Sequence, residues 1–511
     1  MPARNRSRGK PRIRLHFLGA TRQVTGSLHF FEFTSEDGTS DLFFVDSGLN
    51  QENEAQNLEN RLPKGIKWSD VKFGIFTHTH LDHIGYLPRA YKEGFRGPVY
   101  GTAPTCDFSG ISLPDSGFLQ EEDARRANAR AKRQAERPAA EPQDGRKPRP
   151  RSKRAPKLVV PLYTQAEAEA CLHLLKPVAY DTPIQLADGI VARFSHASHL
   201  LGAAVVTLDI GKGSHKRTIA LSGDVGRPSY PVLKDLALVP HADYVVCEGT
   251  YGDRVHEAYD RQAHLAEMVK AAYERAKKPG PNGCGVIIIP AFAIGRVQSV
   301  LFDLRELMLA GRIPTIPVIV DSPMAIKANA VYRRYPELYA GKAAQLAARG
   351  IDPFRTPEFA EVADYKDSQH LLQPASKPVI IIGSSGMATG GRITNHLKYR
   401  LPGANNTVIF VGYQANGTMG RMLTQEEKPE TVRMFGEDVP VRATILHTGG
   451  YSGHGDYNDI IRWLRGFKVK PKKLFLVHGD EEALLALADR VKRTLGIDVV
   501  VPSHREYHDL I

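Results

Sequence analysis

Residues 78–85 read HTHLDHIG and follow the apolar run VKFGIFT. That run is short, aromatic and β-branched, so it predicts a buried strand. Three imidazoles and a carboxylate lie close together at one strand end. Such a cluster indicates a divalent metal site, since zinc binds imidazole nitrogen and carboxylate oxygen. Alternation sends His78 and His80 to one side, while Asp82 and His83 turn towards a neighbouring position as the chain bends into a helix. The stretch therefore predicts two metal ions.

Strand-like runs surround this stretch. IRLHFLGA, SLHFFEF and DLFFVDSG precede it, and strands resume at IVARFSH, AAVVTLDI, TIALSGD and YVVCEG. Near Glu248 the rhythm changes, because CGVIIIPAF, PVIVDS, KPVIIIGS and NTVIFVGY alternate with helix-forming stretches such as 256–278 and Gly295 to about Leu309. This alternation predicts a separate parallel α/β layer. Beyond it we expect a helix at IIRWLRGF, a strand at KKLFLV, a helix at EEALLALADRVKRTL and a last strand at IDVVVPS.

The composition is that of a large globular protein. Of 511 residues, 42% are hydrophobic and 24% charged, which excludes collagen-like, coiled-coil and wholly disordered chains. The most apolar run, GVIIIPAFAIG at residues 285–295, is far shorter than the roughly 18 residues that span a bilayer, so no membrane partner is expected. Four cysteines lie tens of residues apart without a C-x-x-C pair, so neither a disulfide framework nor a thiolate zinc site is signalled. We expect a reducing, cytoplasmic location.

The net charge of +12 comes from two segments. Residues 1–14 hold six cations and no acid, and residues 125–157 hold thirteen Arg and Lys against three acids, so the rest of the chain is mildly acidic. Residues 121–137 contain helix formers with little apolar face, and 138–157 is rich in Pro, Arg and Lys, which predicts a solvated helix leading into a basic flexible insertion over about 124–157. Such runs either aid solubility or attract a polyanion such as RNA.

The H-x-H-x-D-H pattern resembles the signature of the metallo-β-lactamase superfamily. IPAFAIGR, DSPMA, SSGMATGGR and FVGYQANGTMGR look like segments of the β-CASP ribonuclease branch, among the bacterial and archaeal relatives of the pre-mRNA 3′-end processing endonuclease. Over roughly residues 13–505 the resemblance implies an α/β protein, an αββα metallo-β-lactamase sandwich with an inserted parallel-sheet α/β β-CASP domain. It implies the sandwich at 13–247 and 453–511 and the β-CASP domain at 248–452, while the clustered charge predicts a basic tail at 1–12.

The resemblance also implies a ligand set. The SHLLG context makes His199 the third-motif ligand rather than His196, and SGD places Asp224 where a carboxylate bridges both ions, although an isolated SGD also marks a plain strand-to-turn junction. Asp46 in FFVDSG matches the aspartate that orients a metal-bound water or a ligand, but turn chemistry alone also explains it. We expect two Zn²⁺, with Mn²⁺ as the alternative, held by His78, His80, Asp82, His83, His199, Asp224 and His478.

Two further motifs carry the implied chemistry. Glu248 in VVCEGTYGDR and His454 in GGYSGHGD match the first and second β-CASP motifs. His447 and His454 both lie in a glycine-rich stretch, where either could be a loop histidine, but only His454 has the S-G-H-G-D context. At the third motif the RNA-processing members have His and the DNA-repair members typically Val, so His478 favours RNA as the partner.

We therefore expect hydrolysis of RNA by water that two zinc ions activate, leaving 5′-phosphate and 3′-hydroxyl ends. His454 is the candidate acid that protonates the departing 3′ oxygen, and Glu248 orients it. The expected catalytic residues are Asp46, Asp82, Glu248 and His454.

Phosphate contacts are weaker predictions. The loop GSSGMATGGR precedes a predicted helix, so Ser384, Ser385 and Gly386 can face an anion, although an ordinary glycine-rich turn explains the loop as well. Arg296 and Arg421 each follow a glycine in a β-CASP-like segment and are equally compatible with surface ion pairs.

Three other functions stay open. A small-molecule thioesterase or lactonase would leave the inserted domain, with Glu248 and His454, without a task. A DNA nuclease is opposed mainly by His478, and an RNA-binding platform without turnover is opposed by the complete ligand set. Endonucleolytic and 5′-exonucleolytic action, and a monomer or a homodimer, are both compatible with the sequence.

Overall fold

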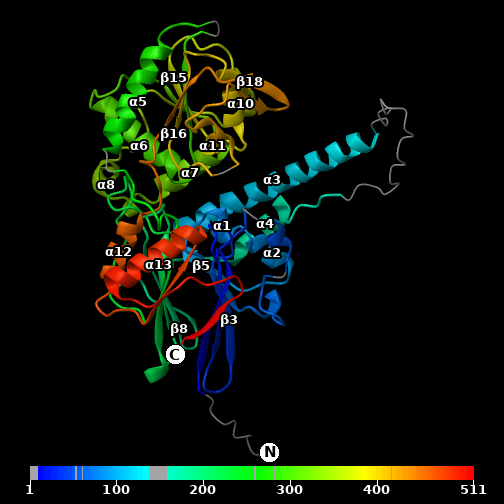
Figure 1. Cartoon of the computed structure of the whole chain (residues 1–511), viewed down its shortest axis with the longest axis vertical. Helices are drawn as coiled ribbons and strands as arrows, with labels where there is room; N and C mark the ends of the chain where they lie inside the picture. The colour runs from blue at the N-terminus through cyan, green and yellow to red at the C-terminus, as the bar shows by residue number, and fades with distance from the viewer. Residues whose placement is uncertain are drawn as a thin grey trace, which may run out of the picture.

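The computed structural model describes residues 10–51, 54–59, 61–136, 158–257, 260–280, 283–415 and 417–510. Figure 1 shows two parts, a pair of sheets in the lower half and a helix-covered sheet above it. The expected basic tail at 1–12 lies mostly outside the described residues, since the first strand begins at Arg12.

The first sheet has seven strands in the order β22-β1-β2-β3-β4-β5-β6. Its early strands form an antiparallel meander, with His29 of β2 opposite Val45 of β3, whereas β3 to β6 are parallel. The last strand of the chain returns to pair with the first, so both ends of the described chain lie in this sheet. The bounds are β1 (Arg12–Gly19), β2 (Leu28–Thr34), β3 (Ser40–Val45), β4 (Phe73–Ile75), β5 (Val99–Thr102), β6 (Leu175–Val178) and β22 (Tyr507–Leu510).

The second sheet also has seven strands, in the order β21-β20-β11-β10-β9-β8-β7. Strands β7 to β10 are antiparallel, and β10, β11, β20 and β21 run parallel to one another. The bounds are β7 (Ile184–Ala187), β8 (Ile190–His196), β9 (Ala204–Ile210), β10 (Arg217–Leu221), β11 (Tyr244–Glu248), β20 (Lys473–Val477) and β21 (Val499–Val500).

An aromatic and aliphatic core joins the two sheets. Phe31, Phe43 and Phe73 stack side by side at centroid distances of 4.9 and 4.7 Å and belong to one buried cluster with Phe194 and Phe475 of the second sheet. Helices cover the two outer faces, so the expected αββα sandwich is confirmed. They are α1 (Leu81–Ile84), α2 (Leu87–Lys92), α3 (Ala103–Glu136) and α4 (Gln165–Cys171) on the first sheet, and α12 (Tyr457–Arg465) and α13 (Glu481–Leu495) on the second.

The third sheet is parallel throughout, in the order β14-β13-β15-β12-β16-β19. Alternate residues of its central strand serve opposite faces, since Ile287 and Ile289 join one buried cluster and Val286 and Ile288 another. Helices on both faces bury these side chains, as expected for a parallel α/β layer. The strands are β12 (Val286–Pro290), β13 (Val318–Val320), β14 (Phe359–Glu361), β15 (Val379–Gly383), β16 (Thr407–Phe410) and β19 (Thr444–His447).

The remaining elements complete this layer. A hairpin stands at its edge, formed by β17 (Thr431–Met434) and β18 (Glu437–Pro440). Its helices are α5 (Arg261–Ala276), α6 (Arg296–Leu309), α7 (Pro323–Arg334), α8 (Gly341–Ala348), α9 (Tyr365–His370), α10 (Arg392–Arg400) and α11 (Met419–Leu423). Short 3₁₀ turns occur at Glu54–Leu58, Trp68–Asp70, Leu172–Leu174, Gly213–His215 and Pro336–Leu338.

The third sheet is inserted between two neighbouring strands of the second. Strands β11 and β20 pair in register from Tyr244 opposite Lys473 to Glu248 opposite Val477, and every strand of the third sheet lies between them in the sequence. The chain therefore leaves the sandwich after Glu248 and returns to it with α12 and then β20, which ends just before His478.

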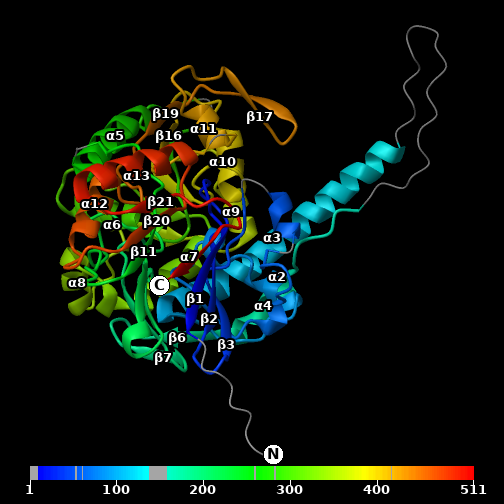
Figure 2. The same cartoon turned by 60° about the horizontal axis from the view of Figure 1, so that its bottom comes forward.

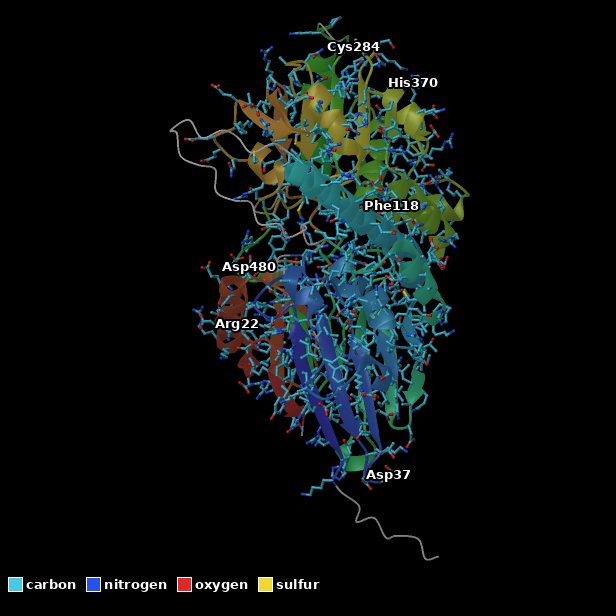
Figure 3. All side chains as sticks on the ribbon, turned by 90° about the vertical axis from the view of Figure 1, so that its right-hand side faces the viewer. Arg22, Asp37, Phe118, Cys284, His370 and Asp480 are labelled. Carbon is cyan, nitrogen blue, oxygen red and sulfur yellow. The ribbon has the colours of Figure 1, made fainter. Side chains whose placement is uncertain are left out.

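Helix α3 connects the two parts and then projects from them (Figure 2). Its first half packs against α4 and α7, and Tyr335 donates a hydrogen bond of 2.6 Å to Asp107 across this junction. In Figure 3 the helix crosses the waist of the molecule, with Phe118 on it, while Cys284 and Asp37 mark opposite ends. The flexible insertion expected from about residue 124 is helical up to Glu136, because alanines and long cations favour a helix, and its remainder, 137–157, lies outside the described residues. None of the described helices is long and apolar enough to cross a membrane.

Candidate metal centre

The candidate site residues lie where parallel strands end. Asp46 follows β3 and His78 follows β4, while Asp224 follows β10, Glu248 ends β11 and His478 follows β20. The carboxyl ends of neighbouring parallel strands share one edge of a sheet, so each sheet delivers its residues to the same side of the sandwich.

The turns after two of these strands are conformationally unusual. Asp46 and His478 have φ angles of 62° and 51°, which non-glycine residues adopt rarely and mainly where a side chain must be aimed at a site.

A first cluster consists of His78, His80, His199 and Asp224. His80 Nδ1 lies 3.2 Å from both His78 Nε2 and His199 Nε2. Asp224 Oδ2 lies 3.3 Å from His78 Nε2 and 3.4 Å from His199 Nε2. Three of the four side chains are almost completely buried, so four donor atoms converge on one point away from bulk water.

A second cluster consists of Asp82, His83 and His478. Asp82 occupies the first turn of α1 and His83 follows it, so the short helix turns both towards β20. His478 Nε2 lies 3.3 Å from Asp82 Oδ2, and Asp224 Oδ1 lies 3.2 Å from His83 Nε2. The two oxygens of Asp224 thus face different clusters.

The spacing of these atoms fits metal coordination. In a tetrahedral site with metal–ligand distances of about 2.0–2.1 Å, ligand atoms stand about 3.3–3.4 Å apart, which matches the separations in the first cluster. Moreover, His83 Nε2 and Asp224 Oδ1 are buried without a hydrogen bond, an arrangement that costs free energy unless another group satisfies them. The donor set, imidazole nitrogen with carboxylate oxygen, suits zinc.

The protonation states agree with this interpretation. Burial lowers the pKa of His78 and His199 and brings the pKa of His80 to about 3, so these rings keep the lone pairs that a metal needs. For His83, burial also acts to lower the pKa, but the carboxylates of Asp224 and Asp46 overcome it and raise the pKa well above its ordinary value. The carboxylates thus make this position electronegative, and a metal cation would compete with the proton for His83 Nε2.

Asp46 fixes the orientation of His83 in the second cluster. Its Oδ1 accepts a hydrogen bond of 2.8 Å from the Thr77 backbone N–H, and its Oδ2 accepts one of 2.8 Å from the Thr77 hydroxyl. The same Oδ2 lies 2.8 Å from His83 Nδ1, which fixes that ring with Nε2 facing Asp224. Of the two roles that the sequence left open for Asp46, orienting a ligand is the one that these contacts support.

His454 stands beside the first cluster with Glu248 behind it. His454 Nδ1 lies 3.0 Å from Glu248 Oε1, and its Nε2 lies 3.9 Å from Asp224 Oδ2. Burial acts to lower the pKa of His454, but Glu248 and Asp224 raise it to about 9. Glu248 is itself fixed by backbone N–H groups of Val225 and Thr250 at 2.7 and 3.1 Å. A proton-carrying imidazole therefore faces the cluster from a rigid support.

The competing histidines lie elsewhere. His196, at the end of β8, stacks on Tyr180 at a centroid distance of 3.9 Å and belongs to neither cluster. His447 ends β19, and its Nε2 donates to the carbonyl of Gly412 at 3.0 Å. His199, in contrast, has Nδ1 3.1 Å from the carbonyl of Gly453, which leaves Nε2 for the cluster.

Comparison with known proteins identifies the family. Residues 297–423 match the Beta-Casp domain, and residues 438–502 match the Zn-dependent metallo-hydrolase RNA specificity domain. The chain is 34% identical over 475 residues to ribonuclease TTHA0252 of Thermus thermophilus, an alignment covering 93% of this chain and 95% of that protein. The chain belongs to the metallo-β-lactamase β-CASP ribonuclease family.

Two further relatives and one solved structure resemble this protein over nearly its whole length. It is 29% identical to transcription termination factor FttA of Methanocaldococcus jannaschii, over 97% of this chain and 71% of that protein. The FttA of Methanosarcina mazei is also 29% identical, over 95% of this chain and 70% of that protein. A crystal structure of a protein of unknown function from Enterococcus faecalis V583 shares the fold at a TM-score of 0.51 and 12% identity, covering 98% of this chain and 100% of that one.

The candidate phosphate-binding residues of this β-CASP protein differ in whether their polar groups are free to contact a phosphate. Arg296 begins α6, donates to the Tyr230 hydroxyl at 2.6 Å, and keeps a buried Nε that makes no hydrogen bond within the described chain. The Ser384 and Ser385 hydroxyls already pair with Ser322 and Thr389, each at 2.9 Å. Gly386 lies in the same loop after β15, and Arg421 lies exposed on α11. Arg296 has the strongest geometric case of these candidates.

Some residues around the site were not predicted. His256 Nε2 lies 2.8 Å from the carbonyl of His454, and the backbone N–H of His256 donates to Asp456 Oδ2 at 2.9 Å. Thr250 bonds His478 Nδ1 at 3.1 Å. The only sequence signal for these residues is their position in TYGDRVH, directly after Glu248.

Proposed function

We propose that this β-CASP protein hydrolyses RNA phosphodiester bonds with two zinc ions and leaves 5′-phosphate and 3′-hydroxyl ends. The observation that carries the proposal is the position of Asp224, which presents one oxygen to each donor cluster, with His454 beside it. The RNA specificity domain match and the ribonuclease named among its relatives support RNA as the substrate.

The first cluster would hold one ion and the second cluster the other, with Asp224 shared. Such a pair supplies Lewis acidity, which makes water nucleophilic near neutral pH and neutralises charge that builds up on a phosphodiester. Mn²⁺ accepts the same nitrogen and oxygen donors and is the alternative metal.

His454 acts as the acid in this proposal. Its Nε2 faces the cluster, and the bond from Nδ1 to buried Glu248 favours the protonated imidazolium. As the water oxygen bonds to phosphorus, the bond between phosphorus and the 3′ oxygen breaks and His454 gives its proton to that oxygen, which leaves as a 3′-hydroxyl. The phosphate, with the oxygen from water, stays on the 5′ oxygen of the following nucleotide. Asp46 holds His83 and Thr77 in register while this happens.

The experiment uses purified protein on 5′- and 3′-labelled RNA and on DNA of the same sequence. Product lengths distinguish endonucleolytic from 5′-exonucleolytic cutting, and susceptibility of the new 5′ end to a phosphatase reports its chemistry. We expect RNA to be cut and DNA to be cut much more slowly.

The matched control compares His78→Ala with His196→Ala. Both remove an imidazole close to the sandwich edge, but only His78 belongs to a donor cluster, so only its loss should abolish cutting. RNA that survives while a thioester or a lactone is turned over would overturn the nuclease assignment.

A further inference from the structure

The carboxyl edge of the third sheet faces the two donor clusters. Strands β15, β12 and β16 are parallel neighbours, so the loops that follow them emerge side by side. Gly295, in the loop after β12, lies against the loop that carries His199, since a Cβ on Gly295 would stand 3.6 Å from Leu200 Cβ. A Cβ on Gly453 would likewise stand 3.0 Å from His199 and 3.4 Å from Arg296.

Two of these loops present aromatic side chains to solvent. Phe292 follows β12 and is 37% exposed, and Tyr413 follows β16 and is 46% exposed. The ring of Tyr251 links the second of them to the active site, because it lies 6.2 Å from the His454 ring and 6.4 Å from the Tyr413 ring. Tyr413 is therefore one ring beyond the candidate acid.

These exposed rings have rigid supports. Gln414, the residue after Tyr413, donates from Nε2 to the carbonyl of Gly412, the residue before it, at 3.1 Å and to that of Gly386 in the loop after β15 at 3.2 Å. The loop that carries Tyr413 is thereby tied to its neighbour. A Cβ on Gly386 would stand 2.9 Å from the backbone nitrogen of Phe292, so both aromatic loops pack against the same glycine. A fixed backbone lowers the entropy lost when a flat ligand binds.

Cations accompany the rings. The Arg254 guanidinium lies 5.6 Å over the Tyr251 ring and also pairs with Asp253 at 2.8 and 3.0 Å. Arg296, at the same edge of the sheet, keeps an Nε without a hydrogen bond among the described residues. Aromatic faces interleaved with guanidinium groups are typical of surfaces that bind single-stranded nucleic acid, where bases stack and phosphates are attracted.

We propose that Tyr413 and Phe292 form a stacking platform for unpaired bases next to the scissile phosphate. The proposal rests on the proposed ribonuclease function and adds to it the side chains that would contact the bases beside the cut. Those bases must be unpaired, because paired and stacked bases within a duplex offer no free face to a protein ring. Recognition of this kind tolerates any base, since every base has an aromatic face.

The test compares Tyr413→Ala, Tyr413→Phe and the control Tyr399→Ala. Tyr399 is also exposed, but it lies near the end of α10, away from the edge where that helix begins. Each protein is assayed on single-stranded RNA and on an oligoribonucleotide of the same length in which every nucleotide is abasic, a phosphodiester chain without aromatic rings. We expect the ratio of the two kcat/KM values to fall about tenfold for Tyr413→Ala and to stay at the wild-type value for Tyr413→Phe and Tyr399→Ala.

Substrates with one abasic nucleotide, 5′ or 3′ of the cut, locate the stacked base. For the wild type, one of these substrates should have a kcat/KM about tenfold lower than the intact RNA. For Tyr413→Ala, the same abasic substrate and the intact RNA should have equal kcat/KM values. An unchanged ratio in a Phe292→Ala Tyr413→Ala double variant, with an active wild type, would overturn the platform alone. A wild type that leaves RNA intact, whether or not it cuts the abasic oligoribonucleotide, would overturn the proposed function and the platform with it.

Discussion

Asp224 couples the two donor clusters at the scale of a single side chain. Its oxygens lie 3.3 Å from His78 Nε2 and 3.2 Å from His83 Nε2. We predict that Asp224→Ala reduces the bound metal to fewer than two ions per chain, because each cluster loses a donor and the two ions lose the anion between them. Elemental analysis after gel filtration measures this.

Asp209→Ala is the control for Asp224→Ala. Asp209 is a carboxylate of the same sheet, on β9, that bonds the Thr218 hydroxyl at 2.6 Å and lies in neither cluster. A full metal content in Asp224→Ala, with native circular dichroism, would contradict the bridging role.

His454 should separate chemistry from metal binding. His454→Gln removes the proposed proton donor but none of the seven residues of the two clusters, although His454 also forms a third group of possible donors with Asp224 and Glu248. We predict that kcat falls about 10²–10⁴-fold while metal content stays that of the wild type. Glu248→Gln, which keeps the shape but not the charge behind the imidazole, should lower kcat less. If His454→Gln instead lost metal, the ring would have to be counted among the ligands.

Residue type and order in the sequence identify some site residues but not others. HTHLDHIG concentrates donors within six positions, so its histidines could be predicted as ligands from the sequence alone. Thr77 and His256 could not, because a threonine or a histidine that acts through a backbone carbonyl or a carboxylate has no spacing to distinguish it. Their roles appear only when distant strands meet.

At the scale of elements, a strong hydrophobic periodicity was enough to predict where helices lie. The helix expected from Gly295 to about Leu309 is α6 (Arg296–Leu309), and the segment EEALLALADRVKRTL is α13 without a residue of difference. Strand β22 was missed because its residues, Tyr-His-Asp-Leu, are mostly polar and only pairing with β1 makes them a strand. Helix α3 begins at Ala103, earlier than expected, and runs through Pro114, because packing against α4 and α7 outweighs the break that proline favours.

The end of β13 gives a prediction about the inserted layer. Buried Asp321 accepts hydrogen bonds from Ser368 at 2.7 Å and from Arg392 at 2.8 Å, and lies 2.6 Å from His396 Nε2. It thereby ties α9 and α10 to the sheet. We predict that Asp321→Ala destabilises this layer by about 3 kcal/mol, since it leaves buried partners uncompensated, and lowers the urea midpoint.

The pH dependence follows from the sign of the pKa shift. Burial acts to raise the pKa of Asp321, but hydrogen bonds from His396, Ser368 and Arg392 lower it below its ordinary 3.8. The stabilisation is therefore complete above pH 3.8 and is lost as the pH falls further, so the gap between wild type and Asp321→Ala should narrow only in acid. Asp367→Ala, an exposed aspartate of α9, is the control and should leave the midpoint nearly unchanged. A gap independent of pH would refute the electrostatic account.

At the scale of the whole molecule, topology explains why the site is composite. The chain leaves the sandwich at Glu248, the end of β11, and re-enters it at α12. It then forms β20, the neighbour of β11, which ends just before His478. Residues 230 positions apart thus meet at one sheet edge, and the layer inserted between them must stand over that edge. The order of motifs predicted this arrangement only through the family resemblance, since no local pattern indicates which strands are neighbours.

The charge distribution carries the last prediction. Arg125 and Arg126 lie on the exposed half of α3, and six further Arg and Lys residues lie within 138–156. If these cations neutralise phosphates, replacing 138–156 by a Gly/Ser linker of equal length in the His454→Gln background should weaken RNA binding and flatten its dependence on salt. The log–log slope should fall by about 0.7 for each phosphate that the linker leaves without its cation. Fluorescence anisotropy at several salt concentrations measures both quantities. A weaker affinity with an unaltered slope would assign the segment to solubility or shape instead, because only released counterions change the slope.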